Sequence, residues 1–193
     1  THRTTARING ASLSGASLYR AILTGADLSC VKLTNAILTD AKINNADLYG
    51  ADLYGADLND AILNYAILTG ANLSGASLYR AILNHANLSG AILTNADLTS
   101  ATLNGADLNG ADLNGADISG AYLNGADLTG AILTYAFVNY TGLSYANLTN
   151  ATLTGADLSY ATLTNATING VIVTKAQLAN LGALNTDTII GIN

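Results

Sequence analysis

The sequence contains no proline, methionine, tryptophan or glutamate, and Cys30 is its only cysteine. A single cysteine excludes a disulfide within the chain and gives no indication of the redox compartment. Charged residues make up 10% of the chain, against about 25% in an ordinary globular domain. No apolar run approaches the roughly 18 residues of a membrane-spanning helix. We therefore expect a soluble protein, and the sequence favours neither a cytoplasmic nor an exported location.

What is present is a narrow set of residue types, in which Ala, Leu, Asn, Thr and Gly dominate. Half of the residues are apolar, which argues against disorder. The segment LSGASLYRAIL at residues 13–23 returns unchanged at residues 73–83. A compositional bias of this kind over 193 residues favours internal repetition over an irregular globular core.

The charges are few and unevenly placed. The formal net charge is −6, from 13 aspartates against 7 lysines and arginines. Because binding to a nucleic-acid backbone requires a basic surface, this balance argues against direct nucleic-acid binding. No Lys or Arg lies between Arg80 and Lys175. The same interval contains Asp97, Asp107, Asp112, Asp117, Asp127 and Asp157.

Apolar residues recur with a period of five. From Ile8 to Val173 every fifth residue is Leu, Ile or Val, and the residue two positions before each is Ala, except at Val31, Thr141 and Val171. A helix shows apolar spacings of three and four, and a strand a spacing of two, so neither pattern fits. Alternating steps of two and three predict a solenoid, in which each five-residue unit forms a short extended side followed by a turn.

The solenoid model accounts for the residue types in each unit. Ala and Leu face the axis, and Gly at the fifth position of many units suits a tight turn. Each buried Leu contributes roughly 1.5–3 kcal/mol to stability. One continuous core of this kind predicts a single cooperative rod without a separate domain.

Segments such as ADLYGADLYGADLND at residues 46–60 and ADLNGADLNGADISG at residues 106–120 resemble the pentapeptide repeat family, whose consensus is A-(D/N)-L-x-x. The resemblance covers residues 6–173, between a tail at 1–5 and a C-terminal cap at 174–193. It implies an all-β fold, a right-handed quadrilateral β-helix (a β-solenoid) with one pentapeptide per side and about eight to nine coils. At about 4.8 Å per coil the rod would be on the order of 40 Å long.

In such a coil, residues twenty apart lie above one another. Arg20, Asp40, Asp60 and Arg80 then form one line along the rod, which we interpret as a structural charge ladder worth about 0–1 kcal/mol per exposed pair. The alternative, a cation site between the two carboxylates, offers few ligands for a metal ion. A second line is expected to hydrogen-bond along the rod as stacked amides: Asn44, Asn64, Asn84, Asn104 and Asn124.

Aromatic residues concentrate in the second half of the repeat. All lie off the two inward-facing series, so we expect them to project outward, with Tyr140 stacked on Tyr160. Exposed aromatic residues are typical of protein contacts. The alternative is that the tyrosines only replace glycine at turns, which does not account for Phe137. The candidate interaction patch is Tyr122, Tyr135, Phe137, Tyr140, Tyr145 and Tyr160.

No catalytic, cofactor-binding or metal site is predicted. Cys30 and His85 occupy separate turns, so they do not form a nucleophile–base pair. A core filled by its own Leu and Ala residues leaves no cavity for a substrate. We therefore expect a protein that is not an enzyme and binds no cofactor.

The two ends of the repeat differ. In the segment TKAQLANLG, Thr174 can cap a short helix over residues 174–181 that Gly182 ends, and such a helix would cover the last coil. The segment THRTT at the other end offers nothing comparable. An uncovered coil presents unpaired backbone groups, so either a preceding segment has been removed or the first coil pairs with a partner. Of the two, we favour end-to-end association between copies.

These features favour a non-catalytic structural or protein-interaction module, with an unidentified protein partner. The resemblance supplies an alternative, because the quinolone-resistance members of the family mimic B-form DNA and bind DNA gyrase and topoisomerase IV. DNA carries one charge per about 1.7 Å of axis, whereas the aspartates after Arg80 provide one per about 4 Å of rod. A third alternative, a flat surface-binding face, depends only on the aligned Thr134, Thr154 and Thr174.

Overall fold

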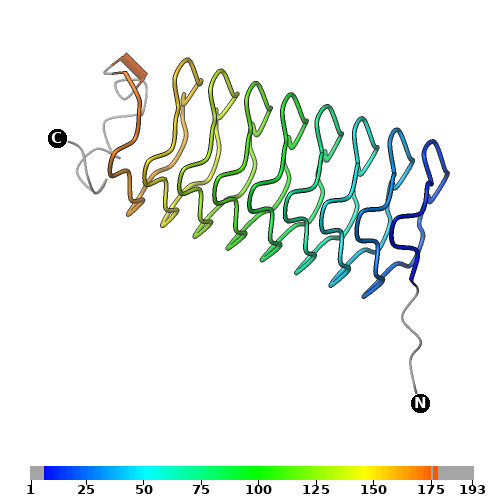
Figure 1. Ribbon diagram of the computed structural model, residues 1–193. Coiled ribbons are helices and arrows are strands. Elements are labelled where there is room, and N and C mark those ends of the chain that lie inside the picture. Colours follow the sequence, from blue (N-terminus) through cyan, green and yellow to red (C-terminus); the bar gives the residue numbers. More distant parts are fainter. Residues whose placement is uncertain (1–6, 175, 178–193) are drawn as a thin grey trace.

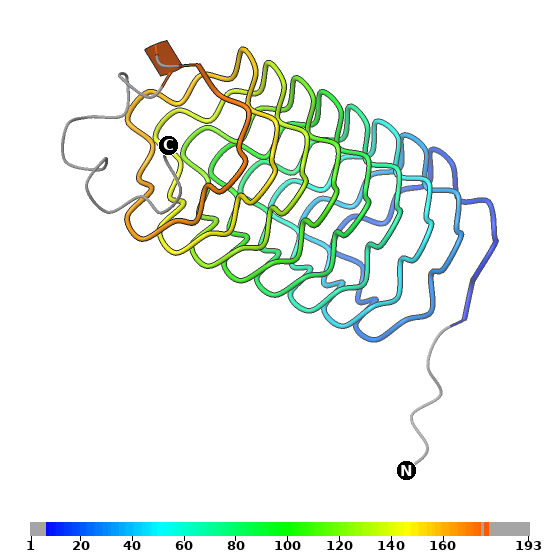
Figure 2. The same ribbon diagram turned by 60° about the vertical axis from the view of Figure 1, so that its left-hand side comes forward.

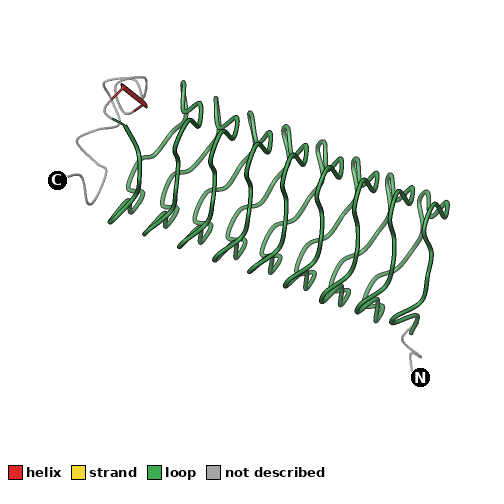
Figure 3. Ribbon diagram, turned by 45° about the horizontal axis from the view of Figure 1, so that its top comes forward, coloured by secondary structure: helices red, strands yellow, loops and turns green. Residues whose placement is uncertain are grey.

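The computed structural model describes residues 7–174, 176 and 177, and it is a rod of stacked coils (Figure 1). Parallel β-bridges join residues twenty apart, from Arg7–Asp27 to Thr152–Ile172. Residues 7–172 therefore form about eight coils of twenty residues each, which lie over one another around a common axis (Figure 2). The bridges are isolated, so these coils contain no longer strand and no helix (Figure 3).

Each coil has four sides, and each side has a bridged residue at its centre. Side A is centred on residue 7 and every twentieth residue after it, side B on residue 12, side C on residue 17 and side D on residue 22. The turns between them are the corners. Corner C–D, for example, contains residues 19 and 20 and every twentieth residue after each of them.

The two inward-facing series fill the axis. Their residues form one continuous buried cluster from Ala26 to Ile168. Ile8, Leu13 and Leu18 of the first coil are only partly buried, because this coil has a described neighbouring coil on one side only. Thr141 interrupts the alanine series and is buried, and its hydroxyl donates a 2.8 Å hydrogen bond to a backbone carbonyl. The repeat itself therefore supplies the whole described core.

Every side ends in a turn whose last residue has a positive φ. All the fifth-position residues from Gly10 to Gly170 have φ between 54° and 72°, whether or not they are glycine. This left-handed conformation costs a residue with a side chain about 1–2 kcal/mol, which Gly avoids and Asn or Asp reduces. The turn is closed by a hydrogen bond, for example from the Ala11 N–H to the Ile8 carbonyl at 3.1 Å.

In units with a described coil on both sides, the backbone uses four of the five N–H groups. In residues 96–100, the first N–H closes the preceding turn, the second donates to the previous coil, and the third and fifth donate to the next coil, at 2.7–3.0 Å. The N–H of the fourth residue, Thr99 in this unit, has no backbone acceptor.

Aspartate at the centre of a side supplies the missing acceptor. Oδ1 of Asp97 accepts the N–H of Thr99 at 2.9 Å. Asn72, Asn87 and Asn147 do the same through the side-chain amide oxygen. All the aspartates at side centres cap their turn in this way: Asp27, Asp47, Asp52, Asp57, Asp97, Asp107, Asp112, Asp117, Asp127 and Asp157.

Side D has no Asp or Asn at its centres, and the asparagine line replaces the cap there. Oδ1 of Asn64 accepts the N–H of Asn84 at 3.0 Å, and the same link continues through Asn104 and Asn124 to Ser144. The amides also bond to one another from Asn84 to Asn124. The predicted hydrogen bonding along the rod is confirmed for these residues, but no described hydrogen bond extends the line back to Asn44.

The side chain of Gln177 ends the series of backbone hydrogen bonds that joins successive coils. From Lys32 onward each central N–H donates to the carbonyl of the residue 21 positions earlier, usually an alanine, so residue 177 would be the donor to Ala156. The side-chain amide of Gln177 takes this place, with bonds to the carbonyls of Ala156 at 2.8 Å and Leu153 at 2.6 Å. The Gln177 N–H donates to Oγ1 of Thr174 at 3.2 Å, and the Thr174 N–H donates to Oε1 of Gln177 at 2.9 Å. This reciprocal pair is a helix capping box.

Residues 176 and 177 are helical and follow the last side (Figure 3). The remainder of the helix predicted over 174–181 lies outside the described residues, as do the tails at 1–5 and 182–193. The division at residues 5 and 173 and the end-to-end association of copies therefore stay predictions.

The acid sensitivity of the turn caps can be measured. Hydrogen bonds from the Ser29 hydroxyl and N–H lower the pKa of Asp27 below the ordinary value of an aspartate, and those from Ser159 do the same to the pKa of Asp157. A carboxyl with a lowered folded-state pKa stabilises the fold above its unfolded pKa, and this contribution is lost as the pH falls through the folded value. We expect the melting temperature to fall from about pH 4 to about pH 2. A variant with Asp27→Asn and Asp157→Asn keeps the caps without a titrating group and should fall less in circular dichroism melts. An equal fall would contradict this assignment.

The end cap makes a second prediction. Gln177→Glu replaces the amide donor by a carboxylate that faces two carbonyl oxygens, so we expect a cost of about 1–3 kcal/mol. Because each coil contacts only its neighbours, hydrogen exchange should accelerate at the amides of the last coil, such as Leu153, and not at Leu93. Uniform acceleration along the rod would show that Gln177 has no local capping role.

Candidate interaction surface

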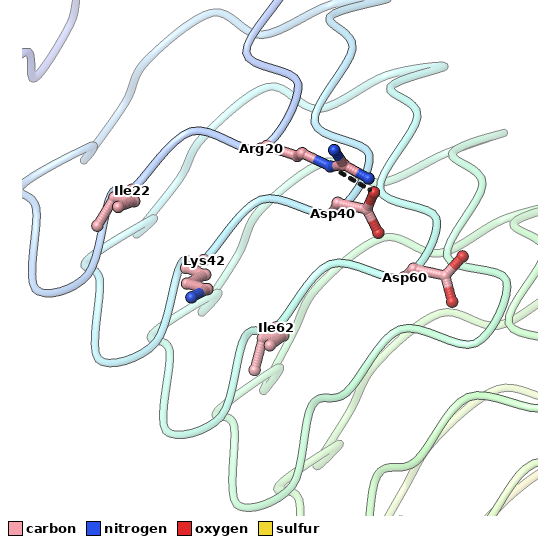
Figure 4. Close-up of a pocket in the computed structure, with 6 residues that line it drawn as sticks. All are labelled: Arg20, Ile22, Asp40, Lys42, Asp60 and Ile62. Carbon is pink, nitrogen blue, oxygen red and sulfur yellow. Dashed lines mark hydrogen bonds and ion pairs between the residues drawn. The ribbon is translucent and has the colours of Figure 1, made fainter.

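The four residues of the predicted charge ladder lie in one line on corner C–D. Nε of Arg20 lies 3.2 Å from Oδ2 of Asp40, and Nε of Arg80 lies 3.0 Å from Oδ1 of Asp60. Figure 4 shows Arg20, Asp40 and Asp60 on successive coils. Together with three side D centres, they line a shallow open hollow of about 420 Å³. These centres are Ile22, Lys42 and Ile62. Each carboxylate therefore has an arginine partner. No group of three or more His, Cys or Asp residues in the described chain could hold a metal ion.

Each of these arginines also stacks on the tyrosine before it in the sequence. The guanidinium carbon of Arg20 lies 4.8 Å from the ring centroid of Tyr19, and that of Arg80 lies 5.8 Å from the centroid of Tyr79. Both distances are typical of cation–π contacts. The predicted ladder did not include these contacts, although the dipeptide Tyr-Arg at both positions could have indicated them.

The six residues of the predicted aromatic patch are all exposed, at 52–68%. Four of them lie on side C and its two corners, and we call this group the side C aromatic cluster: Tyr135, Phe137, Tyr140 and Tyr160. The rings of Tyr140 and Tyr160 stack, with centroids 4.9 Å apart and planes 12° apart. The twenty-residue register predicts this contact.

The other two aromatic residues lie around the corner from this cluster. Tyr122 is at a centre of side D, where it bridges to Gly142, and Tyr145 is on corner D–A. The predicted patch therefore covers two sides of the rod, and only the side C aromatic cluster shares one of them.

Acidic residues flank the cluster along the rod. Phe137 bridges to Asp117 in the coil before it and to Asp157 in the coil after it. Oδ1 of Asp117 accepts the Ser119 N–H at 2.9 Å, and Oδ1 of Asp157 accepts both the N–H and the hydroxyl of Ser159, at 3.0 and 2.6 Å. Oδ2 of either carboxylate accepts no hydrogen bond from the described residues. Side C thus presents carboxylate, phenyl and carboxylate at intervals of about 4.8 Å.

The cluster occupies positions where other residues would fit at lower cost. Tyr135, Tyr140 and Tyr160 have φ of 57°, 59° and 60°, in the region that costs a large side chain about 1–2 kcal/mol. Phe137 stands at a side centre, where Asp or Asn would cap the turn and a phenyl ring cannot. The same φ recurs at every turn of the rod, so the cost at these positions comes from the large side chain that each of them carries.

Side chains at the fifth position lean over the next coil. The Tyr135 ring covers Gly155, where an added methyl group would overlap its atoms, and the His85 ring covers Gly105 in the same way. On corner D–A, Tyr65 stacks on His85 with centroids 5.1 Å apart. Tyr135 and His85 therefore each lie over a glycine of the following coil, and Tyr65 and Tyr140 over a second ring.

A family model for pentapeptide repeats matches the chain with eight copies. The matched segments lie within residues 6–180 and leave only residue 142 of that range unmatched. The chain belongs to the pentapeptide repeat family. Proteins of this family adopt a right-handed β-helix and are typically structural repeat proteins without catalytic activity. The family expected from the A-(D/N)-L-x-x segments is thus confirmed.

Three solved structures illustrate the similarity. HetL is a pentapeptide repeat protein involved in heterocyst differentiation regulation in the cyanobacterium Nostoc sp. strain PCC 7120; it is 35% identical over 88% of this chain and 83% of its own, with a TM-score of 0.34. QnrB1, a plasmid-mediated fluoroquinolone resistance protein, is 18% identical over 98% of this chain and 91% of its own, with a TM-score of 0.52. At that identity the likeness concerns the fold alone.

The third is a pentapeptide repeat protein from the thylakoid lumen of Arabidopsis thaliana, 31% identical over 65% of this chain and 81% of its own, with a TM-score of 0.32. A search of curated protein sequences finds no significant match. Within the described residues, no helix has the length and apolar character needed to cross a membrane.

The position of the Tyr135 ring makes a prediction. Gly155→Ala and Gly130→Ala both place a side chain at a positive φ, but only the methyl group at residue 155 meets a ring, since nothing lies within 4 Å of residue 130. We expect Gly130→Ala to cost about 1–2 kcal/mol and Gly155→Ala to cost more in thermal unfolding. Adding Tyr135→Ser should remove the difference. Equal costs for the two glycine variants would show that the ring does not lie over Gly155.

Proposed function

We propose that this protein is a non-catalytic interaction module, and that the side C aromatic cluster is its contact surface for a protein partner. The observation that carries the proposal is the placement of four exposed aromatic side chains at positions where the repeat would be more stable without them. Three are tyrosines at positive φ, and the fourth, Phe137, replaces a turn cap. A contact function accounts for these costs.

The rod suits this function because it holds the rings in place before binding. Tyr140 is stacked on Tyr160, and Tyr135 leans on the following coil. Tyrosine loses little conformational entropy when it is immobilised, and a surface that is already ordered loses less still. Exposed apolar groups on a soluble rod are otherwise a liability for aggregation.

The alternative function, an acidic rod that binds DNA gyrase or topoisomerase as a DNA mimic, has less support. The ten aspartates at side centres all cap their own turns. The acidity of the rod therefore follows from the needs of the repeat and does not require a partner to explain it. The likeness to QnrB1 adds only the fold.

The proposal predicts that capture of a partner depends on the cluster. The chain and a variant with Phe137→Ser and Tyr140→Ser would serve as baits in lysate of the source organism. Both changes are compatible with the fold, because Ser77 and Ser100 occupy equivalent positions in the same two lines. We expect any specifically captured protein to be reduced at least tenfold, on the scale of losing a contact residue worth above about 1 kcal/mol.

The matched control removes two exposed tyrosines elsewhere, Tyr49→Ser and Tyr54→Ser, and should retain the captured protein. If the cluster variant retains its partner while the control loses it, the contact surface lies in the first half of the rod and the proposal is wrong.

A further inference from the structure

On corner C–D, one arginine contacts both an exposed tyrosine and an exposed carboxylate, and this arrangement occurs twice. In the first half of this corner, Arg20 stacks on Tyr19 and pairs with Asp40, and the mirrored arrangement joins Arg80 to Tyr79 and Asp60. In each case one guanidinium contacts an aromatic face and a carboxylate together. The combination suits arginine because its planar cation stacks on rings and also donates several hydrogen bonds.

The second half of the same corner has the rings and the carboxylates without the arginine. Beyond Arg80 the line continues through Ser100 and Gly120 to Tyr140 and Tyr160. Asp117 and Asp157 lie on the adjoining side, on either side of Phe137. The sequence has no Lys or Arg between residues 80 and 175, so no residue of this interval can supply the cation.

We propose that side C, from Asp117 to Asp157, binds an arginine-containing extended segment of a partner protein. The partner's guanidinium groups stack on Phe137 and on the Tyr140–Tyr160 pair, and they donate hydrogen bonds to Oδ2 of the two aspartates. This inference rests on the proposed interaction function and adds the chemistry of the partner.

Charge and geometry both favour a basic partner over a neutral or acidic one. The carboxylates already accept a turn N–H through Oδ1, so each retains an oxygen with no described donor. Along side C the two aspartates are two coils apart, or about 10 Å. Residues i and i+2 of an extended peptide are about 7 Å apart, and long arginine side chains bridge the difference. An acidic segment would meet uncompensated like charge here.

Side A provides a comparison surface with the same charge in the same part of the rod. Asp107 and Asp127 are bridged neighbours there and cap their turns as Asp117 and Asp157 do. No aromatic residue stands between or beside them at a side centre, since Asn87 and Asn147 flank the pair. A partner that needs both ring and carboxylate should therefore distinguish side C from side A.

The probe is a short peptide that alternates arginine and serine, with its ends blocked, titrated into the isotope-labelled protein by NMR. Single exposed cation–π contacts and ion pairs are weak, so we expect saturable binding with a dissociation constant on the order of 10⁻⁴ to 10⁻³ M. The shifted amides should lie at residues 117–160 on side C and corner C–D. The matching lysine–serine peptide should bind several-fold more weakly, since an ammonium group has no planar face that can stack against the face of a ring.

Two variants separate the parts of the site. Tyr140→Ser with Tyr160→Ser should weaken arginine–serine binding about tenfold through loss of stacking. Asp117→Asn with Asp157→Asn should weaken it to a similar degree and reduce its salt dependence. These asparagines retain the turn caps, as Asn72 and Asn147 do. The control, Asp107→Asn with Asp127→Asn, removes the same charge from side A and should change the dissociation constant less than about twofold.

Several outcomes would overturn the inference. Binding that weakens equally in the side A control would reflect only net charge, and a glutamine–serine peptide that binds as well would remove the role of the cation. If no saturable shift appears while Phe137 and Tyr140 remain necessary for capture of a partner, the interaction function stands and its partner is not basic. If capture does not depend on them either, both proposals fall.

Discussion

The hydrogen-bonding requirement of one backbone N–H group in five determines much of this sequence. In units between two described coils, four backbone N–H groups donate within the turn or to a neighbouring coil, and the N–H of the fourth residue has no backbone acceptor. A short side chain with an oxygen at the side centre satisfies it, which is why Asp and Asn recur between Ala and Leu. On side D, where no Asp or Asn holds a centre, the Asn64–Asn124 line fulfils the same requirement from the neighbouring coil.

This requirement separates the residues that the fold needs from those that it tolerates. Aspartates at side centres stabilise the turns by accepting the fourth residue's N–H, so the fold accounts for their charge. The side C aromatic cluster has the opposite character, because its tyrosines take a conformation that glycine adopts more readily and Phe137 leaves a turn without a cap. The clearest functional signal on such a regular surface is therefore a departure from the repeat that costs stability.

A period of five, sustained from Ile8 to Val173, indicated a solenoid, and the resemblance to the pentapeptide repeat family implied the four-sided coil of twenty residues. That coil also placed Tyr140 over Tyr160 and Arg20 beside Asp40, since register alone determines those neighbours. Features that depend on side-chain direction could not be predicted this way. The lean of Tyr135 over Gly155, the stacking of Arg80 on Tyr79 and the substitution of the Gln177 amide for a ladder N–H all require rotamers, which the period does not encode.

The strict twenty-residue register has a consequence for how such a chain can change over generations. Insertion or loss of one whole coil lengthens or shortens the rod and leaves every downstream side chain on its own side. Insertion or loss of a single five-residue unit keeps the core equally well filled, but it moves every later residue to the next side of the rod. Residues before and after the change then no longer align. The two copies of LSGASLYRAIL begin at residues 13 and 73, a whole number of coils apart. Duplication by coils is the one route that copies a surface together with the fold that supports it.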